Sequence, residues 1–431
     1  MPMTPEPPAQ PAVRTRQILA AVIGNALEWY DFVVYGFLTV IISRLFFPAD
    51  SEYASLLIAM ATFGVGFFMR PVGGILIGIY ADRRGRKAAM QLIILLMTVA
   101  IAMIAFAPPY AAIGAAAPVI IVLARLLQGA ATGGEFASAT AFLIESAPPH
   151  RRGFFGSLQM VGQSVAALGG ATAGMLVTQG LTPEQLDSWG WRLPFIFGLL
   201  IGPVGLWMRR HLDETEAFVE AAHDAAQPVG LGALLREHLR EVLVSFGLVL
   251  SSTIMFYVVL IYMPTYAKTQ LQIPLNDAFT AQVAGLLCLT VLVPLFGALS
   301  DRIGRRPVLL LASALYLVLP YPLMGWVLAE PSLARLAVMQ AALCSAIAVG
   351  FGAISTALAE QFPVRQRSTG LALAYNIAVM LFGGFAQLIV TWLIGVTGTP
   401  LAPAYYVMFG AVAGFVAAAC IADRHRQLEL H

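Results

Sequence analysis

Ionisable side chains interrupt the long apolar stretches well inside them at five positions, all in the first half of the chain: Glu28, Asp31, Arg70, Arg125 and Glu135. A charge near the middle of a bilayer is costly unless it is paired or hydrated, so each position marks a candidate functional site. Arginine can hold a carboxylate through two parallel hydrogen bonds, and a carboxylate can take up and release a proton. These residue types favour anion binding coupled to proton movement.

Helical spacing places these residues on shared faces, since successive residues turn by about 100°. One face carries Asn25, Glu28, Asp31 and Tyr35, and a second carries Arg125, Gln128, Thr132 and Glu135. Arg125 and Glu135 are about 15 Å apart along their helix axis, so they need partners on other helices. We therefore expect each helix to turn one polar stripe inward.

The chemistry of each group suggests its role. We expect Arg125 to face a central cavity and contact a substrate carboxylate, whereas Arg70 either shares this task or ties its helix to an acidic neighbour. Glu28, Asp31 and Glu135 are either proton carriers or structural counter-ions, and Asp31 and Glu135 are the favoured titrating pair. A carboxylate whose partner alternates between an arginine and a proton changes its proton affinity with conformation. All six histidines fall in predicted loops or the tail, so histidine is not the expected proton carrier.

In the second half the polar groups of the apolar stretches are neutral. Hydroxyl and amide groups suit hydrogen bonding to a ligand rich in oxygen atoms. The complete predicted substrate-binding set is Asn25, Arg70, Arg125, Gln128, Tyr257, Tyr262 and Asn376.

Two charged motifs occur twice. The loop Gly78–Lys87 recurs as Gly297–Arg306, an offset of 219 residues (297 − 78), and Glu145 with Arg152 recurs as Glu360 with Arg367, an offset of 215 (360 − 145). Such an internal duplication places a substrate site between the repeats, near the midplane. Charges at helix ends can bridge neighbouring helices and hold one arrangement shut. The predicted gating residues are Asp82, Arg86, Glu145, Arg152, Asp301, Arg305, Glu360 and Arg367; the alternative is a charge cluster that only sets topology.

The composition places these groups in a membrane. Hydrophobic residues make up 59% of the 431 residues and charged residues 11%, whereas a soluble domain carries about 25% charged residues. A spanning helix needs about 20 apolar residues. We predict an all-α membrane protein with twelve helices, at about 17–43, 53–80, 88–107, 114–143, 154–180, 191–208, 242–268, 278–300, 307–328, 333–359, 368–396 and 402–422.

Positive charges predict the orientation. Of the 25 lysines and arginines, Arg70 and Arg125 lie inside helices, four lie on one side of the membrane and the other nineteen on the opposite side, which is therefore the predicted cytoplasmic side. Both termini are expected there, in the inner membrane, without a cleaved signal. The predicted divisions are a tail at 1–16, a six-helix bundle at 17–208, a cytoplasmic linker at 209–241, a second bundle at 242–422 and a tail at 423–431.

The loop motif G-x-x-x-D-R-x-G-R-[KR] resembles the signature of the major facilitator superfamily, whose fold is two pseudo-symmetric six-helix bundles. The segments Gly24–Phe32, Arg70–Gly74, Arg125–Gly129 and Gly133–Glu135 are similar to its metabolite/proton symporter branch. The segments Phe46–Ala54 and Tyr262–Tyr266 are most similar to the citrate and tricarballylate members.

This resemblance implies a proton-coupled importer of a small organic acid, citrate or a related tricarboxylate, that works by alternating access. The alternatives are 2-oxoglutarate, shikimate or a betaine-type solute, or a sodium-coupled citrate carrier. A channel would need rings or filters, and an enzyme would need a metal or nucleophile cluster; the sequence suggests neither. We expect a monomer in the lipid bilayer with no cofactor, no metal and no nucleic-acid partner.

Overall fold

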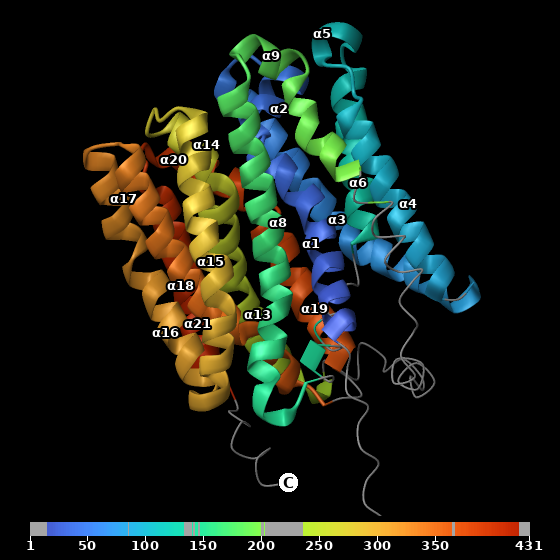
Figure 1. Cartoon of the computed structure of the whole chain (residues 1–431), viewed down its shortest axis with the longest axis vertical. Coiled ribbons are helices and arrows are strands. Elements are labelled where there is room, and N and C mark those ends of the chain that lie inside the picture. Colours follow the sequence, from blue (N-terminus) through green and yellow to red (C-terminus); the bar gives the residue numbers. More distant parts are fainter. Residues whose placement is uncertain are drawn as a thin grey trace, which may run out of the picture.

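The computed structural model describes residues 15–84, 86–132, 140, 143–144, 147–199, 202, 236–363 and 367–421, and every regular element within them is helical. Figure 1 shows the long helices side by side in one bundle, with the early helices on one side and the late helices on the other. The long segments form helices because, in lipid, each backbone amide must be satisfied within its own segment. The predicted all-α membrane fold is confirmed.

The first half contains α1 (Thr15–Phe37), α2 (Thr39–Phe46), α3 (Glu52–Arg84), α4 (Arg86–Ala105), α5 (Tyr110–Ile113), α6 (Ala116–Ala131), α8 (Arg152–Gly180) and α9 (Pro183–Ser188). The second half contains α13 (Leu239–Met255), the π-helix η3 (Phe256–Tyr262), α14 (Met263–Thr269), α15 (Leu275–Ile303), α16 (Arg305–Val318), α17 (Pro320–Ala329), α18 (Leu333–Gln361), α19 (Arg367–Ala378), the π-helix η5 (Val379–Gly383), α20 (Ala386–Thr397) and α21 (Ala402–Ala419).

Eight helices of the described part are long and apolar enough to cross a membrane, and the bent pair Val22–Phe37 and Thr39–Phe46 makes a ninth. Gln91–Ala105 and Ala116–Ala131 are shorter apolar helices at the predicted third and fourth spans. The predicted sixth span, 191–208, is described only to residue 199 and at 202, and the predicted linker is described only from residue 236.

The first span bends by 62° between α1 and α2. The hydroxyl of Thr39 donates to the carbonyls of Tyr35, at 3.0 Å, and Gly36, at 2.8 Å. A threonine bonded back to the preceding turn competes with the backbone ladder and bends helices. The bend therefore has a local cause in the sequence.

The two halves meet along α8 and α15, which lie next to each other in Figure 1. At one end Gly153 approaches Asp301, and at the other the amide of Gln179 donates to the hydroxyl of Thr280 at 3.0 Å. A second contact between the halves joins α3 to α20 and η5, where the rings of Phe68 and Phe385 are 5.4 Å apart. The halves thus touch on both sides of the space between them.

Candidate functional site

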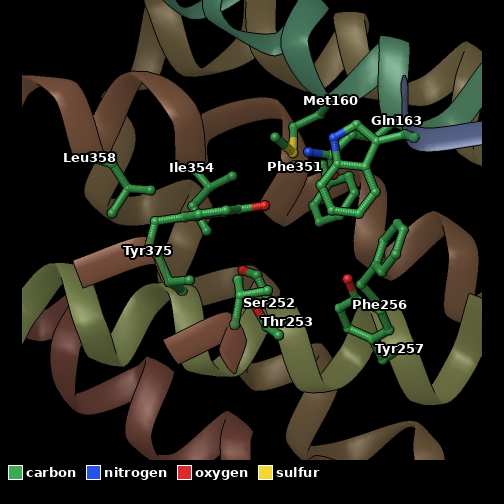
Figure 2. Close-up of a pocket in the computed structure, with 13 residues that line it drawn as sticks. Met160, Gln163, Ser252, Thr253, Phe256, Tyr257, Phe351, Ile354, Leu358 and Tyr375 are labelled. Carbon is green, nitrogen blue, oxygen red and sulfur yellow. The ribbon is translucent and has the colours of Figure 1, made fainter. Parts of the chain in front are cut away.

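A cavity lies between the halves and draws its walls from both. Its lining residues are Trp29 of α1, Met160 and Gln163 of α8, Val249, Ser252 and Thr253 of α13, Phe256 and Tyr257 of η3, Phe351, Ile354 and Leu358 of α18, Tyr375 of α19 and Val379 of η5. Figure 2 shows the hydroxyl groups of Tyr375, Ser252 and Tyr257 around this space, together with the ring of Phe351. The cavity of about 30 Å³ has room for about one water molecule.

Arg125 of α6 is completely buried beside this region. One of its terminal nitrogens donates to the side-chain oxygen of Gln128 at 2.7 Å, and the other donates to the carbonyl of Phe63 at 3.2 Å. The rings of Phe32, Tyr35 and Phe63 surround the guanidinium with centroids 4.3 to 4.8 Å away. Arg125 and Gln128, which helical spacing places on one face of α6, thus hydrogen-bond each other, and the faces of three aromatic rings surround the charge.

Arg70 of α3 lies closer to the cavity. Its guanidinium is 4.6 Å from the ring of Phe67, 4.9 Å from Phe32 and 5.5 Å from the cavity-lining Trp29. The hydroxyl of Tyr375 is within hydrogen-bonding reach of Arg70 and of Gln163. No described carboxylate forms an ion pair with Arg70 or with Arg125. Arg70 therefore does not tie α3 to a described acidic residue, which was one of its two predicted roles.

The polar residues of α1 point to different neighbours. The side chain of Asn25 donates to the backbone carbonyl of Gln159 at 3.0 Å, and the side chain of Gln159 donates to the Asn25 side-chain oxygen at 3.1 Å. Asp31 is buried against Gly198, where an added Cβ would lie 2.3 Å from a carboxylate oxygen. Glu28 is half-buried and has an interaction partner. Asn25, Asp31 and Tyr35 of the expected polar stripe are thus buried, but none of them lines the cavity, to which α1 contributes Trp29.

The predicted residues of the second half occupy three different environments. Tyr257 lines the cavity, and no described group hydrogen-bonds its buried hydroxyl. The hydroxyl of Tyr262 lies 3.2 Å from that of Thr391, which also reaches the sulfur of Met60 across the interface of the halves at 3.2 Å. Asn376 is half-buried on α19, has an interaction partner, and does not line this cavity.

Both π-helices contribute to the cavity wall, through Tyr257 in η3 and Val379 in η5. Such wide turns are frequent at functional sites. For η3 the sequence supplies a cause, since Pro264 lies two residues beyond the end of the segment. A proline has no N–H and its ring clashes with the carbonyl four residues earlier, which a wider turn relieves.

At the predicted cytoplasmic end, Asp301 joins the second half to the first. Its two oxygens accept hydrogen bonds from the backbone N–H groups of Gly153, at 2.7 Å, and Phe154, at 2.9 Å. Arg305 is nearly buried and lies 3.2 Å from both Asp301 and Glu360. The N-terminus of α8 carries a partial positive charge, so a carboxylate there is stabilised by the helix as well as by Arg305.

The other predicted gating residues fall in two groups. The guanidinium of Arg367 donates to the carbonyl of Ala359 at 2.9 Å, and the backbone carbonyl of Arg152 accepts from the hydroxyl of Thr356 at 3.0 Å. The first contact joins α19 to α18, and the second joins α18 to α8. The side chains of Asp82 and Arg86, as well as Glu145 and the predicted proton carrier Glu135, lie outside the described residues.

Several cavity residues were not predicted as site residues: Trp29, Met160, Gln163, Ser252, Thr253, Phe256, Phe351 and Tyr375. Most are apolar or aromatic and look like ordinary membrane-helix residues. Gln163 carried a usable signal, because a glutamine four residues from Gln159 within an apolar helix marks one polar face. The aromatic residues carried no such signal, since only the packing of the halves reveals which rings face inward.

The comparisons with known proteins agree with this arrangement. A model of the family described as "Sugar (and other) transporter" matches residues 17–227 and 210–424. The citrate-proton symporter of Salmonella typhi is 37% identical over 406 residues, covering 94% of this chain and 93% of the relative. The glycine betaine/proline/ectoine/pipecolic acid transporter OusA of Dickeya dadantii is 33% identical, covering 93% of this chain and 82% of the relative. A crystal structure of a D-xylose-proton symporter superimposes with a TM-score of 0.75 at 18% identity, over 94% of this chain and 97% of that one, which establishes a shared fold.

Proposed function

Because the chain belongs to the sugar (and other) transporter family of the major facilitator superfamily, we propose that it imports a small organic acid together with protons, with citrate or a related tricarboxylate as the first candidate. It is a transporter and not an enzyme. In this proposal the cavity between the halves binds the substrate, and the halves rock about it so that the cavity opens to one side at a time.

The observation that carries the proposal is the pair of buried arginines without a described counter-ion. Arg70 and Arg125 are 4% and 0% exposed, and aromatic rings surround both guanidinium groups. A buried cation is costly unless a partner or hydrogen bonds compensate for the lost water. A substrate carboxylate would supply the negative charge that the arginines lack. Arg70 is close enough to the cavity for this, because it is within hydrogen-bonding reach of Tyr375, which lines the cavity. An anion is therefore the substrate that these cations fit.

Binding of an acid the size of citrate requires movement. A space of about 30 Å³ is far smaller than a typical ligand pocket, which has a volume of about 300–1,000 Å³. Rings that separate Arg125 from the cavity, Phe32 and Phe63, would have to shift before its guanidinium could meet a carboxylate. Such a shift belongs naturally to a cycle in which the two halves separate and close again.

Proton coupling and gating complete the proposal. Asp31 is the favoured described carboxylate for the proton, although it faces Gly198 and not the cavity, so any coupling to the substrate would run through a movement of α1. Asp301, Arg305 and Glu360 would hold the predicted cytoplasmic end shut until the halves rock. The orientation of the chain, with both termini cytoplasmic, is part of the same proposal.

A betaine-type zwitterion is the second candidate, and the wall of the cavity favours it. Five of the thirteen lining residues, Trp29, Phe256, Tyr257, Phe351 and Tyr375, are aromatic. The faces of aromatic rings attract a cation and disfavour an anion, and cages of such rings recognise quaternary ammonium groups. The ammonium would occupy the ring-lined space while the carboxylate of the same molecule met Arg70.

A binding and transport screen separates these candidates. The purified protein is heated with citrate, tricarballylate, 2-oxoglutarate, shikimate, glycine betaine and proline, because a ligand of the folded state raises apparent stability by mass action. Counterflow of each radiolabelled hit into proteoliposomes then tests transport. Stabilisation and counterflow by tricarboxylates support the first candidate, and a response to betaine alone replaces it with the second. Binding without counterflow of any hit would overturn the transport proposal.

A further inference from the structure

The wide turn η3 leaves one backbone carbonyl without its normal partner. In a π-helix the carbonyl of residue i accepts from the N–H of residue i+5. For Val259, that residue is Pro264, which has no N–H to donate. Val259 is buried at 1% exposure, so water cannot take the place of the missing donor. A buried carbonyl of this kind needs another partner within the protein.

Gln340 of α18 supplies that partner. Its side-chain nitrogen donates to the Val259 carbonyl at 3.1 Å and also donates to the side-chain oxygen of Gln282 on α15. Both glutamines are buried, at 1% and 0% exposure. Because a carbonyl only accepts, the Val259 contact requires that nitrogen, not oxygen, of the Gln340 amide face η3. Gln282 then presents its oxygen to the same nitrogen and holds this orientation.

Packing alone does not account for the glutamine pair. The nitrogen of Gln282 and the oxygen of Gln340 have no hydrogen-bond partner among the described residues. Two leucines would fill similar space without these unpaired polar atoms, which are costly to bury. The interaction that offsets this cost is the bond to the Val259 carbonyl, which only a donor at position 340 can make.

The turn held by this bond carries two of the predicted substrate residues. Tyr257 lies two residues before Val259 and lines the cavity, and Tyr262 lies three residues after it and contacts Thr391 of α20. We propose that Gln340, oriented by Gln282, is a positioning residue that replaces the backbone hydrogen bond absent at Pro264 and thereby keeps Tyr257 facing the substrate. The effect on substrate binding rests on the proposed function, whereas the bond to η3 does not.

The proposal predicts a rescue between two substitutions. Gln340→Met keeps the length of the side chain but removes the donor, and we expect the KM for uptake to rise about fivefold, the effect of losing one hydrogen bond. Pro264→Ala restores the backbone N–H at position 264, which can then donate to the Val259 carbonyl. In the Pro264→Ala background, Gln340→Met should therefore change KM by less than about twofold. Gln282→Met, which leaves the donor but not its orientation, should have a smaller effect than Gln340→Met.

Hydrogen–deuterium exchange provides a measurement that needs no substrate. Peptides covering 256–265 should exchange faster in Gln340→Met than in the wild type and return toward wild-type exchange in the double variant. Ser345→Ala is the matched control, because the Ser345 hydroxyl lies on the same helix and, among the residues that the structure describes, bonds only to the carbonyl of Ala341 within it.

The outcomes separate the two proposals. Unchanged exchange in Gln340→Met, or no rescue by Pro264→Ala, would overturn the role of Gln340. If exchange responds as expected but the KM of every variant stays at the wild-type value, the bond exists but does not position the site, which also contradicts the proposal. If the wild type transports none of the candidate solutes, the proposed function fails while the exchange data still decide the bond between Gln340 and η3.

Discussion

The carboxylate of Asp301 in the second half accepts a hydrogen bond of 2.7 Å from the backbone N–H of Gly153 in the first half. The charged loop that carries Asp301 was recognisable in the sequence, and within its own half Asp301 also forms an ion pair with Arg305. Across the interface, Asp301 caps the first turn of α8, where unpaired N–H groups and the helix dipole both favour an anion. One ion–helix contact thus connects the two halves at the predicted cytoplasmic end.

This contact predicts that Asp301→Asn slows transport without weakening substrate binding. An asparagine loses the charge that the helix end favours, and the maximal rate should fall about fivefold, in line with the loss of a helix cap. Asp82→Asn is expected to act similarly at the duplicated position. Uptake kinetics and binding affinity are measured in parallel, with Asp277→Asn at the opposite end of α15 as the control. Unchanged rates in both variants would remove the gating role.

Gly153→Ala should disturb the same contact by steric means. An added Cβ would lie 2.4 Å from the hydroxyl of Ser300 and 2.6 Å from the carbonyl of Gly297, so α8 and α15 must move apart. We expect the predicted cytoplasmic end to open more often, and a cysteine introduced at Ser157 to react faster with a membrane-impermeant thiol reagent. Gly325→Ala is the control, because no neighbouring side chain or helix of the described structure lies within 4 Å of its added Cβ. Equal labelling in both backgrounds would show that α8 and α15 tolerate the methyl group.

Arg125→Lys should weaken substrate binding about tenfold, or ~1.4 kcal/mol. Lysine keeps the charge but loses the planar fork that can bond a carboxylate and stack on Phe32 and Phe63 at once. Calorimetric titration of the purified variant measures the change. Arg335→Lys is a suitable control, since Arg335 also stacks on an aromatic ring, Trp326, but lies in the first turn of α18 and does not line the cavity. Wild-type affinity in Arg125→Lys would exclude a contact with substrate.

Coupling should depend on Asp31. Moving an anion into a negatively charged cell costs about 2.3 kcal/mol per charge per 100 mV, so a cation must enter with it. Asp31→Asn should abolish accumulation driven by a pH gradient in proteoliposomes while sparing exchange of substrate for substrate, which never requires release of the proton by the empty carrier. Glu135→Gln is tested in the same way. If Asp31→Asn still accumulates substrate against its gradient, Glu135 or Glu28 is the proton carrier instead. If accumulation by the wild type requires sodium and does not depend on pH, protons are not the coupling ion.

Trp29→Leu distinguishes the two substrate classes. If the aromatic wall binds an ammonium group, losing its indole should weaken betaine binding by about 2- to 30-fold, the range that cation–π contacts support. Citrate binding should change little, because an anion gains nothing from the ring face. Trp392→Leu, at a ring that is 52% exposed on the outside of the bundle, controls for general effects of removing tryptophan. Equal loss for both solutes would indicate a purely structural role.

The sequence by itself determined the membrane fold, the duplication and the identity of the charged groups. Apolar segments of about 20 residues leave little choice but helices in lipid, because their backbone amides have no other partners. Isolated charges within such segments are recognisable for the same reason, since lipid does not tolerate them without a function. Arg70, Arg125 and the loop with Asp301 and Arg305 were therefore visible without a structure.

Only the tertiary structure decided what those groups face. The direction of a side chain on a membrane helix depends on which neighbours pack around it, and apolar residues suit lipid, a helix interface and a cavity wall equally well. Trp29, not Asp31, therefore proved to be the residue of α1 that lines the cavity, and Asp301 was found on the end of α8. The bond from Gln340 to Val259 was also beyond sequence reasoning, because it joins residues 81 positions apart through a turn whose width Pro264 sets.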